Sequence, residues 1–373
     1  SGGYERPMWF ALDGEKAEYE YSYNYQSWYP SAEYETNNTI KNVGLFDLTP
    51  FSKFEIKSDI AHQELQRICT ANIKNEIGKC TYTHMLNSDG GIETDLTVVC
   101  IDKDHFRIIS SAATRERDKF HIKKHLSGSI ELNDTTDDYC VFGLFGPKSR
   151  DLIKTISKDN FDKDNFKFGT AKYIMIEGIK IWAQRLSYVG ELGYELYVKM
   201  NDAKKIYELL IEKGKDFNLS NCGMHAMDIM RMESGFLHWG HDISPEENQY
   251  QAGLSFTISN KKGVEFVGKK ALEKIKKEKI KSRFAMFTLN TSKPGQPLLL
   301  HDEPIYQDDK IIGRSTSGNY SFNFKKNLTF GYINNDFSNE ELKNKNLFIE
   351  VEKKKYPISI QTEALKRTDF KNL

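Results

Sequence analysis

A strongly basic segment at residues 261–283 divides the sequence into two parts that follow different patterns. Ten of its residues are Lys or Arg and three are Glu. The interleaved Glu residues favour a solvated linker helix, and an RNA-binding surface is the alternative. After this segment, short runs of alternating apolar and polar residues are separated by turns, which is typical of a β-barrel. The chain therefore combines an all-β C-terminal domain with an N-terminal part of another kind.

The N-terminal part mixes helices and strands. The alternation at residues 43–57 predicts paired strands, and residues 82–100 predict a β-hairpin, because residues 88–91 supply Asp and two glycines for the turn. A second unit of the same kind is predicted by strands at 140–147, 174–186 and 194–198 and a helix at 203–213. The predicted fold class is α+β, with four segments: 1–135 (N-terminal segment and first α+β unit), 136–260 (second α+β unit), 261–283 (basic linker) and 284–373 (C-terminal β-barrel).

Composition excludes several classes of protein. The 373 residues include 53 Lys and Arg against 53 Asp and Glu, so no overall basic charge would attract nucleic acid or acidic lipid. No apolar run reaches the roughly 18 residues of a membrane span, and the first residues do not have the pattern of a signal peptide. The five cysteines are scattered without a C-x-x-C pair, which favours a reducing compartment and predicts a cytoplasmic location without a thiolate zinc site.

The first candidate site lies on the hairpin at residues 82–100. Tyr82 is on one strand and Asp95 on the other, on either side of the Gly90-Gly91 turn. From the pattern alone, Asp95 is either exposed on the alternate face or placed in a pocket. A buried carboxylate beside a tyrosine could hold a cationic amine or take a proton.

The second candidate site surrounds another glycine-containing turn. Tyr188 precedes the turn at residues 190–193, and Glu195 follows it on the returning strand. A buried Glu195 would need a partner, and Arg231, in an apolar helix, is a candidate. The alternative is that these residues form ordinary ion pairs.

Two further motifs have weaker interpretations. His238, His241 and Asp242 lie close together in sequence, but packing or capping roles are favoured over a metal site. Residues 263–270 nearly match a phosphate-binding loop, except that Lys270 replaces the hydroxyl residue that would hold magnesium. There is no G-x-S-x-G or G-x-G-x-x-G motif, so covalent hydrolysis and a dinucleotide site have little support.

Several segments occur in order and together resemble one family. They are VGLFDLTPFSKFEI (43–56), YTHMLNSDGGIETDLTVV (82–99), RLSYVGELGYELYV (185–198), DIMRMESGFLHWGHDISPEE (228–247), AGLSF (252–256) and EFVGKKAL (265–272). This combination resembles the glycine-cleavage T-protein family, which comprises tetrahydrofolate-dependent aminomethyltransferases and the folate-binding halves of dimethylglycine and sarcosine dehydrogenases. The opening YERPMWFA and the run GGIETDLTV are most similar to the dehydrogenase-associated branch.

The resemblance implies a three-domain cloverleaf of two mixed α/β domains and a C-terminal β-barrel, with tetrahydrofolate as cofactor. It implies that Asp95 is catalytic, that Tyr82 lies near the reactive folate nitrogens, that Tyr188 and Glu195 contact the pterin, and that Arg231 belongs to the folate site. Ser111 stands where the aminomethyltransferases usually have Asn, and Arg367 is a candidate contact for the glutamate tail.

The activity implied is transfer of a one-carbon unit to tetrahydrofolate, giving 5,10-methylenetetrahydrofolate. The donor would be an aminomethyl group or the iminium or formaldehyde unit of an N-methyl amine. Partners would be this small amine donor and either an oxidase or dehydrogenase or a lipoyl carrier protein, without nucleic acid or membrane. The alternatives are a folate-dependent demethylase of another methyl donor and a non-catalytic folate-binding module.

Overall fold

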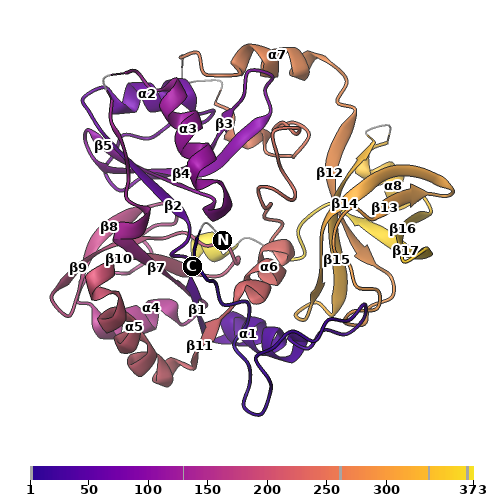
Figure 1. Ribbon diagram of the computed structural model, residues 1–373, viewed down its shortest axis with the longest axis horizontal. Coiled ribbons are helices and arrows are strands. Elements are labelled where there is room, and N and C mark those ends of the chain that lie inside the picture. The colour runs from indigo at the N-terminus through magenta and orange to yellow at the C-terminus, as the bar shows by residue number, and fades with distance from the viewer. Residues whose placement is uncertain (1–2, 129, 260–262, 335–336, 367–368) are drawn as a thin grey trace.

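The computed structural model describes residues 3–128, 130–259, 263–334, 337–366 and 369–373, and these form three lobes (Figure 1). Two lobes are each built on a β-sheet, and the third is a closed barrel. The helices are α1 (Tyr29–Lys41), α2 (Ala61–Ile68), α3 (Arg115–His125), α4 (Ser149–Ile156), α5 (Met200–Gly214), α6 (Met224–Glu233), α7 (Lys269–Lys277) and α8 (Asn339–Lys343). No helix among the described residues is long and apolar enough to cross a membrane.

The first sheet has the strand order β3-β4-β5-β2-β6. Its strands are β2 (Ser52–Lys57), β3 (Cys80–Leu86), β4 (Ile92–Asp102), β5 (His105–Ser110) and β6 (Leu132–Asp134). One face buries Phe54 and Ile56 against α2 and α3. Helix α2 suits this position because Ala61, Leu65 and Ile68 recur at helical spacing and are all buried.

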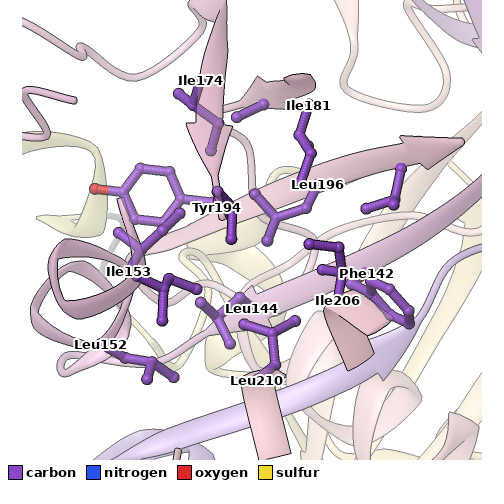
Figure 2. Close-up of a cluster of buried hydrophobic side chains, with 14 of the residues drawn as sticks. Phe142, Leu144, Leu152, Ile153, Ile174, Ile181, Tyr194, Leu196, Ile206 and Leu210 are labelled. Carbon is purple, nitrogen blue, oxygen red and sulfur yellow. The ribbon is translucent and has the colours of Figure 1, made fainter. Parts of the chain in front are cut away.

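The second sheet has the order β11-β1-β7-β10-β9-β8. Its strands are β1 (Val43–Asp47), β7 (Tyr139–Phe145), β8 (Ala171–Ile176), β9 (Ile179–Gln184), β10 (Gly193–Lys199) and β11 (Leu219–Cys222). Figure 2 shows its outer core, in which Leu144 and Leu196 meet Leu152 of α4 and Ile206 of α5. Successive strand residues point to opposite faces, so Glu195 and Tyr197, which flank Leu196, point away from these helices.

The first and second sheets pack against each other through the faces that their helices do not cover. Val99 of β4 belongs to the same buried cluster as Val141, Trp182 and Tyr197 of the second sheet. This apolar contact fixes the position of the first sheet relative to the second. Side chains on these inner faces, including those of the two candidate hairpins, are therefore directed toward the facing sheet.

The third lobe is a six-stranded barrel in the order β12-β15-β14-β13-β16-β17. Its strands are β12 (Ser282–Leu289), β13 (Pro304–Gln307), β14 (Lys310–Ser321), β15 (Lys326–Asn334), β16 (Leu347–Val351) and β17 (Lys354–Gln361). Helix α1 ties the barrel to the rest, because Tyr29 and Ala32 pack with Ile229 of α6 and Phe322 beyond β14. The predicted combination of two mixed units and a β-barrel is confirmed.

Several local predictions need correction. Residues 43–57 form two strands, but β1 pairs with β7 and β11 while β2 pairs with β5 and β6, so they are not partners. Residues 174–186 are not one strand, because β8 and β9 form a hairpin whose turn residues Glu177 and Gly178 both have positive φ. The three boundaries between the four predicted segments stay a prediction, although β1 lies in the sheet made mainly from the second unit.

Candidate active site

The turn between β3 and β4 is shaped by Asn87 and two glycines. The Asn87 Oδ1 atom accepts hydrogen bonds from the backbone N–H groups of Asp89 and Gly91. Gly90 has a φ of 87°, and a Cβ at Gly91 would lie 1.9 Å from the Pro245 carbonyl oxygen. Only glycine at these positions lets the hairpin tip rest on the loop that follows α6.

The hairpin places Tyr82, His84 and Asp95 on one face. Tyr82 and His84 are two residues apart on β3, and His84 lies directly opposite Asp95 in the strand register. The His84 Nε2 atom is 3.3 Å from the Tyr82 hydroxyl and 3.5 Å from Asp95 Oδ1. The two residues predicted from the sequence are therefore neighbours, with a histidine between them that the sequence analysis did not select.

Asp95 is an incompletely satisfied carboxyl group. Its side chain is 20% exposed, whereas its Oδ1 atom is buried and has no hydrogen-bond partner among the described residues. Burial raises the pKa of Asp95 to about 7, with the Tyr82 hydroxyl opposing the rise and Asp118 adding to it. A carboxyl group in this state can give or take a proton near neutral pH.

The second hairpin directs Glu195 toward the first sheet. Glu195 lies on β10 between Gly143 of β7 and Gln184 of β9, and it accepts a 3.1 Å hydrogen bond from the Tyr197 hydroxyl. Burial raises the pKa of Glu195 to about 7. Burial also raises the pKa of the Cys80 thiol on β3, and the nearby Glu195 carboxylate adds to that rise. Glu195 therefore faces the strand that carries Tyr82.

Tyr188 precedes β10 and contacts the loop that follows α6. Its hydroxyl donates a 2.8 Å hydrogen bond to the Leu237 carbonyl, and its ring stacks on Phe236. Burial raises the pKa of Tyr188, Arg231 opposes this, and Asp95 is close enough to add to it. Asp95 and Tyr188 also raise the pKa of Tyr82, so these three side chains lie close enough to interact electrostatically.

Arg231 is near Tyr188 but is largely occupied by protein acceptors. Its Nε atom donates to Asp228, one Nη atom donates to the Phe236 carbonyl and to Asp242, and the other donates to Ser317. These bonds use four of the five guanidinium hydrogens. Arg231 is therefore held as a link between α6 and the barrel, and its predicted contact with folate stays a prediction.

Asp242 completes this network. Its side chain is fully buried and accepts hydrogen bonds from Arg231, Thr316, Ser317 and the backbone N–H of His238. From the sequence, Asp242 is notable only as a neighbour of His238 and His241. A buried carboxylate needs a partner, so partners for Asp242 could have been sought. Its two hydroxyl donors lie 74 and 75 residues further along the chain, however, and no local pattern points to them. No group of three or more potential metal-ligating side chains occurs within the described part of the chain.

Two other residues were considered from the sequence. The Ser111 hydroxyl accepts a hydrogen bond from the Ala113 N–H and so caps a short 3₁₀ turn at Ala112–Thr114. Arg367 lies outside the described residues. In the basic segment, Lys269 of α7 pairs with Glu265, but Leu272 of the same helix is buried with Leu86 and Ile92 of the first hairpin, so α7 is not solvated on all sides.

The chemistry of these groups fits a reduced pterin. A carboxylate can accept two parallel hydrogen bonds from the adjacent ring N–H and amino group of a pterin, which suits Glu195. Tyr82 is 40% exposed on the edge strand β3, so its ring offers a flat surface. The unpartnered Asp95 oxygen is a further group that a bound molecule could satisfy.

Comparison with known proteins identifies the class to which this fold and site belong. Residues 1–262 match the GCVT N-terminal domain, and residues 283–365 match the glycine cleavage T-protein C-terminal barrel domain. The chain belongs to the glycine cleavage T-protein family, an aminomethyltransferase-like family of folate-dependent enzymes, as the sequence resemblance predicts.

Individual relatives represent both branches of the family. Dimethylglycine dehydrogenase of Rattus norvegicus is 31% identical over 98% of this chain and 42% of its own length. The 4-methylaminobutanoate oxidase (formaldehyde-forming) of Paenarthrobacter nicotinovorans is 35% identical over 85% of this chain and 38% of its length. An aminomethyltransferase of Halothermothrix orenii is 32% identical over 81% of this chain and 83% of its length. The chain thus spans about two fifths of the first two proteins.

The predicted cloverleaf is confirmed by a solved structure. The glycine cleavage system aminomethyltransferase T from Bartonella henselae superposes with a TM-score of 0.80 and covers 94% of each chain at 19% identity. At this identity the comparison establishes the fold.

Proposed function

We propose that the chain transfers a one-carbon unit from an amine donor to tetrahydrofolate and yields 5,10-methylenetetrahydrofolate. The observation that carries this proposal is the buried, unpartnered Asp95 oxygen beside Tyr82, on a hairpin whose strand β3 also faces Glu195. Tetrahydrofolate would supply the nucleophilic nitrogens that accept the carbon. The protein then has to orient the reactants and move protons, and it needs no nucleophile of its own.

Four of the five predicted site residues, all except Arg231, have a role in this proposal. Glu195 binds and orients the pterin through its carboxylate, while Tyr82 and Tyr188 provide flat contact surfaces. The methylene bridge requires two new carbon–nitrogen bonds, so each of the two folate nitrogens releases a proton. Asp95 relays protons from these nitrogens to the departing group, which leaves as the protonated amine from an iminium donor or as water from formaldehyde, so the proton count balances. As a carboxylate it also stabilises the positive charge of an aminomethyl or iminium donor.

The donor that we favour is the one-carbon unit of an oxidised N-methyl amine. The names of two relatives, dimethylglycine dehydrogenase and 4-methylaminobutanoate oxidase, denote oxidation of N-methyl amines, which supports this choice. The partner would then be an oxidase or dehydrogenase activity that produces the iminium or formaldehyde unit. A lipoyl carrier with an aminomethyl group is the second candidate, favoured by the relative named aminomethyltransferase.

The test combines binding with product formation. Tetrahydrofolate is titrated into the chain by calorimetry, and 5,10-methylenetetrahydrofolate is then measured with formaldehyde as the probe donor, above the rate of the uncatalysed reaction. We expect folate binding in both the wild type and Asp95→Asn, and at least a hundredfold slower catalysed product formation in the variant. Asp89→Asn, in the exposed turn of the same hairpin, is the matched control and should keep its activity.

Absence of folate binding would contradict the proposal. Binding without catalysed product from any donor would instead favour the non-catalytic folate-binding module. Product formation at a normal rate by Asp95→Asn would remove this residue from the chemistry.

A further inference from the structure

The hydrogen bonds of Thr257 determine where the proton of His84 lies. The Thr257 hydroxyl donates a 2.7 Å hydrogen bond to the Leu254 carbonyl oxygen. The same hydroxyl oxygen is 3.0 Å from His84 Nδ1. A hydroxyl has one hydrogen, and we assign it to the shorter, 2.7 Å contact with Leu254, so the Thr257 oxygen accepts from His84 Nδ1. The Nδ1 atom must then carry the hydrogen, and the Nε2 atom of a neutral imidazole is left with a lone pair.

This lone pair faces the candidate acid–base group. The Nε2 atom is 3.5 Å from the buried Asp95 Oδ1 atom and 3.3 Å from the Tyr82 hydroxyl. A lone pair and an ionised carboxylate oxygen repel each other, because neither has a hydrogen to donate. Protonation of Asp95 removes this repulsion and gives Oδ1 a hydrogen that it can donate to Nε2.

His84 can remain neutral while its Nε2 atom accepts a hydrogen bond from protonated Asp95. Its side chain is fully buried, and burial lowers the pKa of His84 to about 3. The titratable groups that interact with Asp95 in the described part of the chain are Tyr82 and His84 on β3, Asp118 on α3, and Tyr188. None of these is a cation at neutral pH, so none stabilises the ionised form of Asp95 by opposite charge.

We propose that His84 is a positioning residue, which Thr257 holds as the Nδ1–H tautomer so that its Nε2 lone pair keeps Asp95 protonated in the resting site. The structural part of this proposal does not depend on activity. Its consequence for turnover rests on the proposed function: a bound cationic donor favours the carboxylate, so Asp95 gives up its resting proton when the donor binds and then moves protons during one-carbon transfer.

The first test measures the tautomer in the unaltered chain. 15N NMR of the histidine-labelled protein correlates the ring nitrogens with the ring hydrogens and so reports which nitrogen is protonated. The variant His84→Gln is used only to assign the signal. We expect a neutral ring with hydrogen on Nδ1 between pH 5 and 9. Hydrogen on Nε2, or a charged ring in that range, would overturn the proposal.

The second test follows Asp95 itself by 13C NMR of labelled aspartate carboxyl groups in the ligand-free protein. Thr257→Val removes the acceptor for Nδ1–H, so the ring can turn its hydrogen to Nε2 and donate to the Asp95 carboxylate. We expect the proton affinity of Asp95 to fall at least about tenfold, and Thr257→Ser to restore it. If Asp95 titrates at an unchanged pH in folded Thr257→Val, Thr257 does not fix the tautomer of His84 and the proposal is wrong.

These readouts separate the two proposals. The expected NMR results in a chain that forms no product would support the role of His84 and contradict the proposed function. Product formation with hydrogen on Nε2 would support the function and overturn the role assigned to His84.

Discussion

Asp95 should make the stability of the chain depend on pH. Its pKa of about 7 in the folded state is higher than that of an unfolded aspartate, so the folded state retains the proton over a wider range. Stability from this group is therefore present at low pH and is lost as the pH rises through about 7. Relative to Asp95→Asn, we expect the unfolding free energy of the wild type to be lower at pH 8 than at pH 6, by about 1 kcal/mol.

Urea denaturation at the two pH values measures this difference. Asp89→Asn serves as the control because residue 89 is exposed, and it should show no such shift. Equal differences at both pH values would show that Asp95 titrates like an ordinary surface carboxylate.

Glu195 should contribute to folate binding rather than to proton transfer. Glu195→Gln replaces one acceptor oxygen by an amide nitrogen, which cannot accept the second of two parallel hydrogen bonds. Because a hydrogen bond to a charged group contributes about 1.5–3 kcal/mol, we expect the Kd for tetrahydrofolate to rise at least about tenfold in calorimetry. Glu208→Gln, exposed on α5, should bind normally, and equal affinities of the two variants would exclude the predicted contact.

At the residue scale, sequence reasoning found the groups that carry familiar chemistry and missed those that orient them. Asp95 and Tyr82 were recognisable because they flank a turn with a clear pattern. His84 belongs to the same strand and was passed over, since its importance depends on Thr257, 173 residues away. Such a contact is created by the tertiary fold and leaves no local pattern.

Individual elements were predictable where a turn or a helical period specifies them locally. The Asp-Gly-Gly turn predicted the hairpin of β3 and β4, and the helix predicted at residues 203–213 lies within α5. The partners of β1 and β2 were not predictable in this way. Two adjacent alternating strands resemble a hairpin, yet each finds its partners through contacts far along the chain.

Helix α1 carries a buried acid that should hold the N-terminal segment in place. Glu35 is 1% exposed, and its two oxygens accept backbone hydrogen bonds from Phe10 at 2.7 Å and Gly223 at 2.8 Å. Burial raises the pKa of Glu35 to about 7, against the effect of these bonds. Glu35→Ala leaves both donors without a partner, so we expect a loss of about 2–5 kcal/mol and faster proteolysis of the segment before α1.

Thermal unfolding and limited proteolysis with mass spectrometry test this expectation. Glu33→Ala changes an exposed glutamate on the same helix and should have little effect on either measurement. If both variants are cut at the same rate, Glu35 does not anchor the segment.

For the whole molecule, the Arg231–Asp242 pair should couple the barrel to the other two lobes. Arg231→Met leaves the fully buried Asp242 without its charged partner, and breaking a buried pair in this way typically costs about 3–5 kcal/mol. Scanning calorimetry should show a lower Tm and a separate transition for the barrel. Arg314→Met breaks the exposed pair with Asp302 within the barrel and should cost less than about 1 kcal/mol. A single transition at an equal Tm in both variants would contradict this coupling.

The division of β1 and β2 between two sheets also determines the order in which a growing chain can fold. Strand β1 ends at Asp47, but its neighbours β7 and β11 are complete only when Phe145 and Cys222 have been synthesised. At usual translation speeds this delay is on the order of ten seconds, during which both edges of an apolar strand remain open on the ribosome. Slow emergence of residues 139–222 would therefore expose the nascent protein to aggregation, and chaperones that cover its first fifty residues should improve the yield.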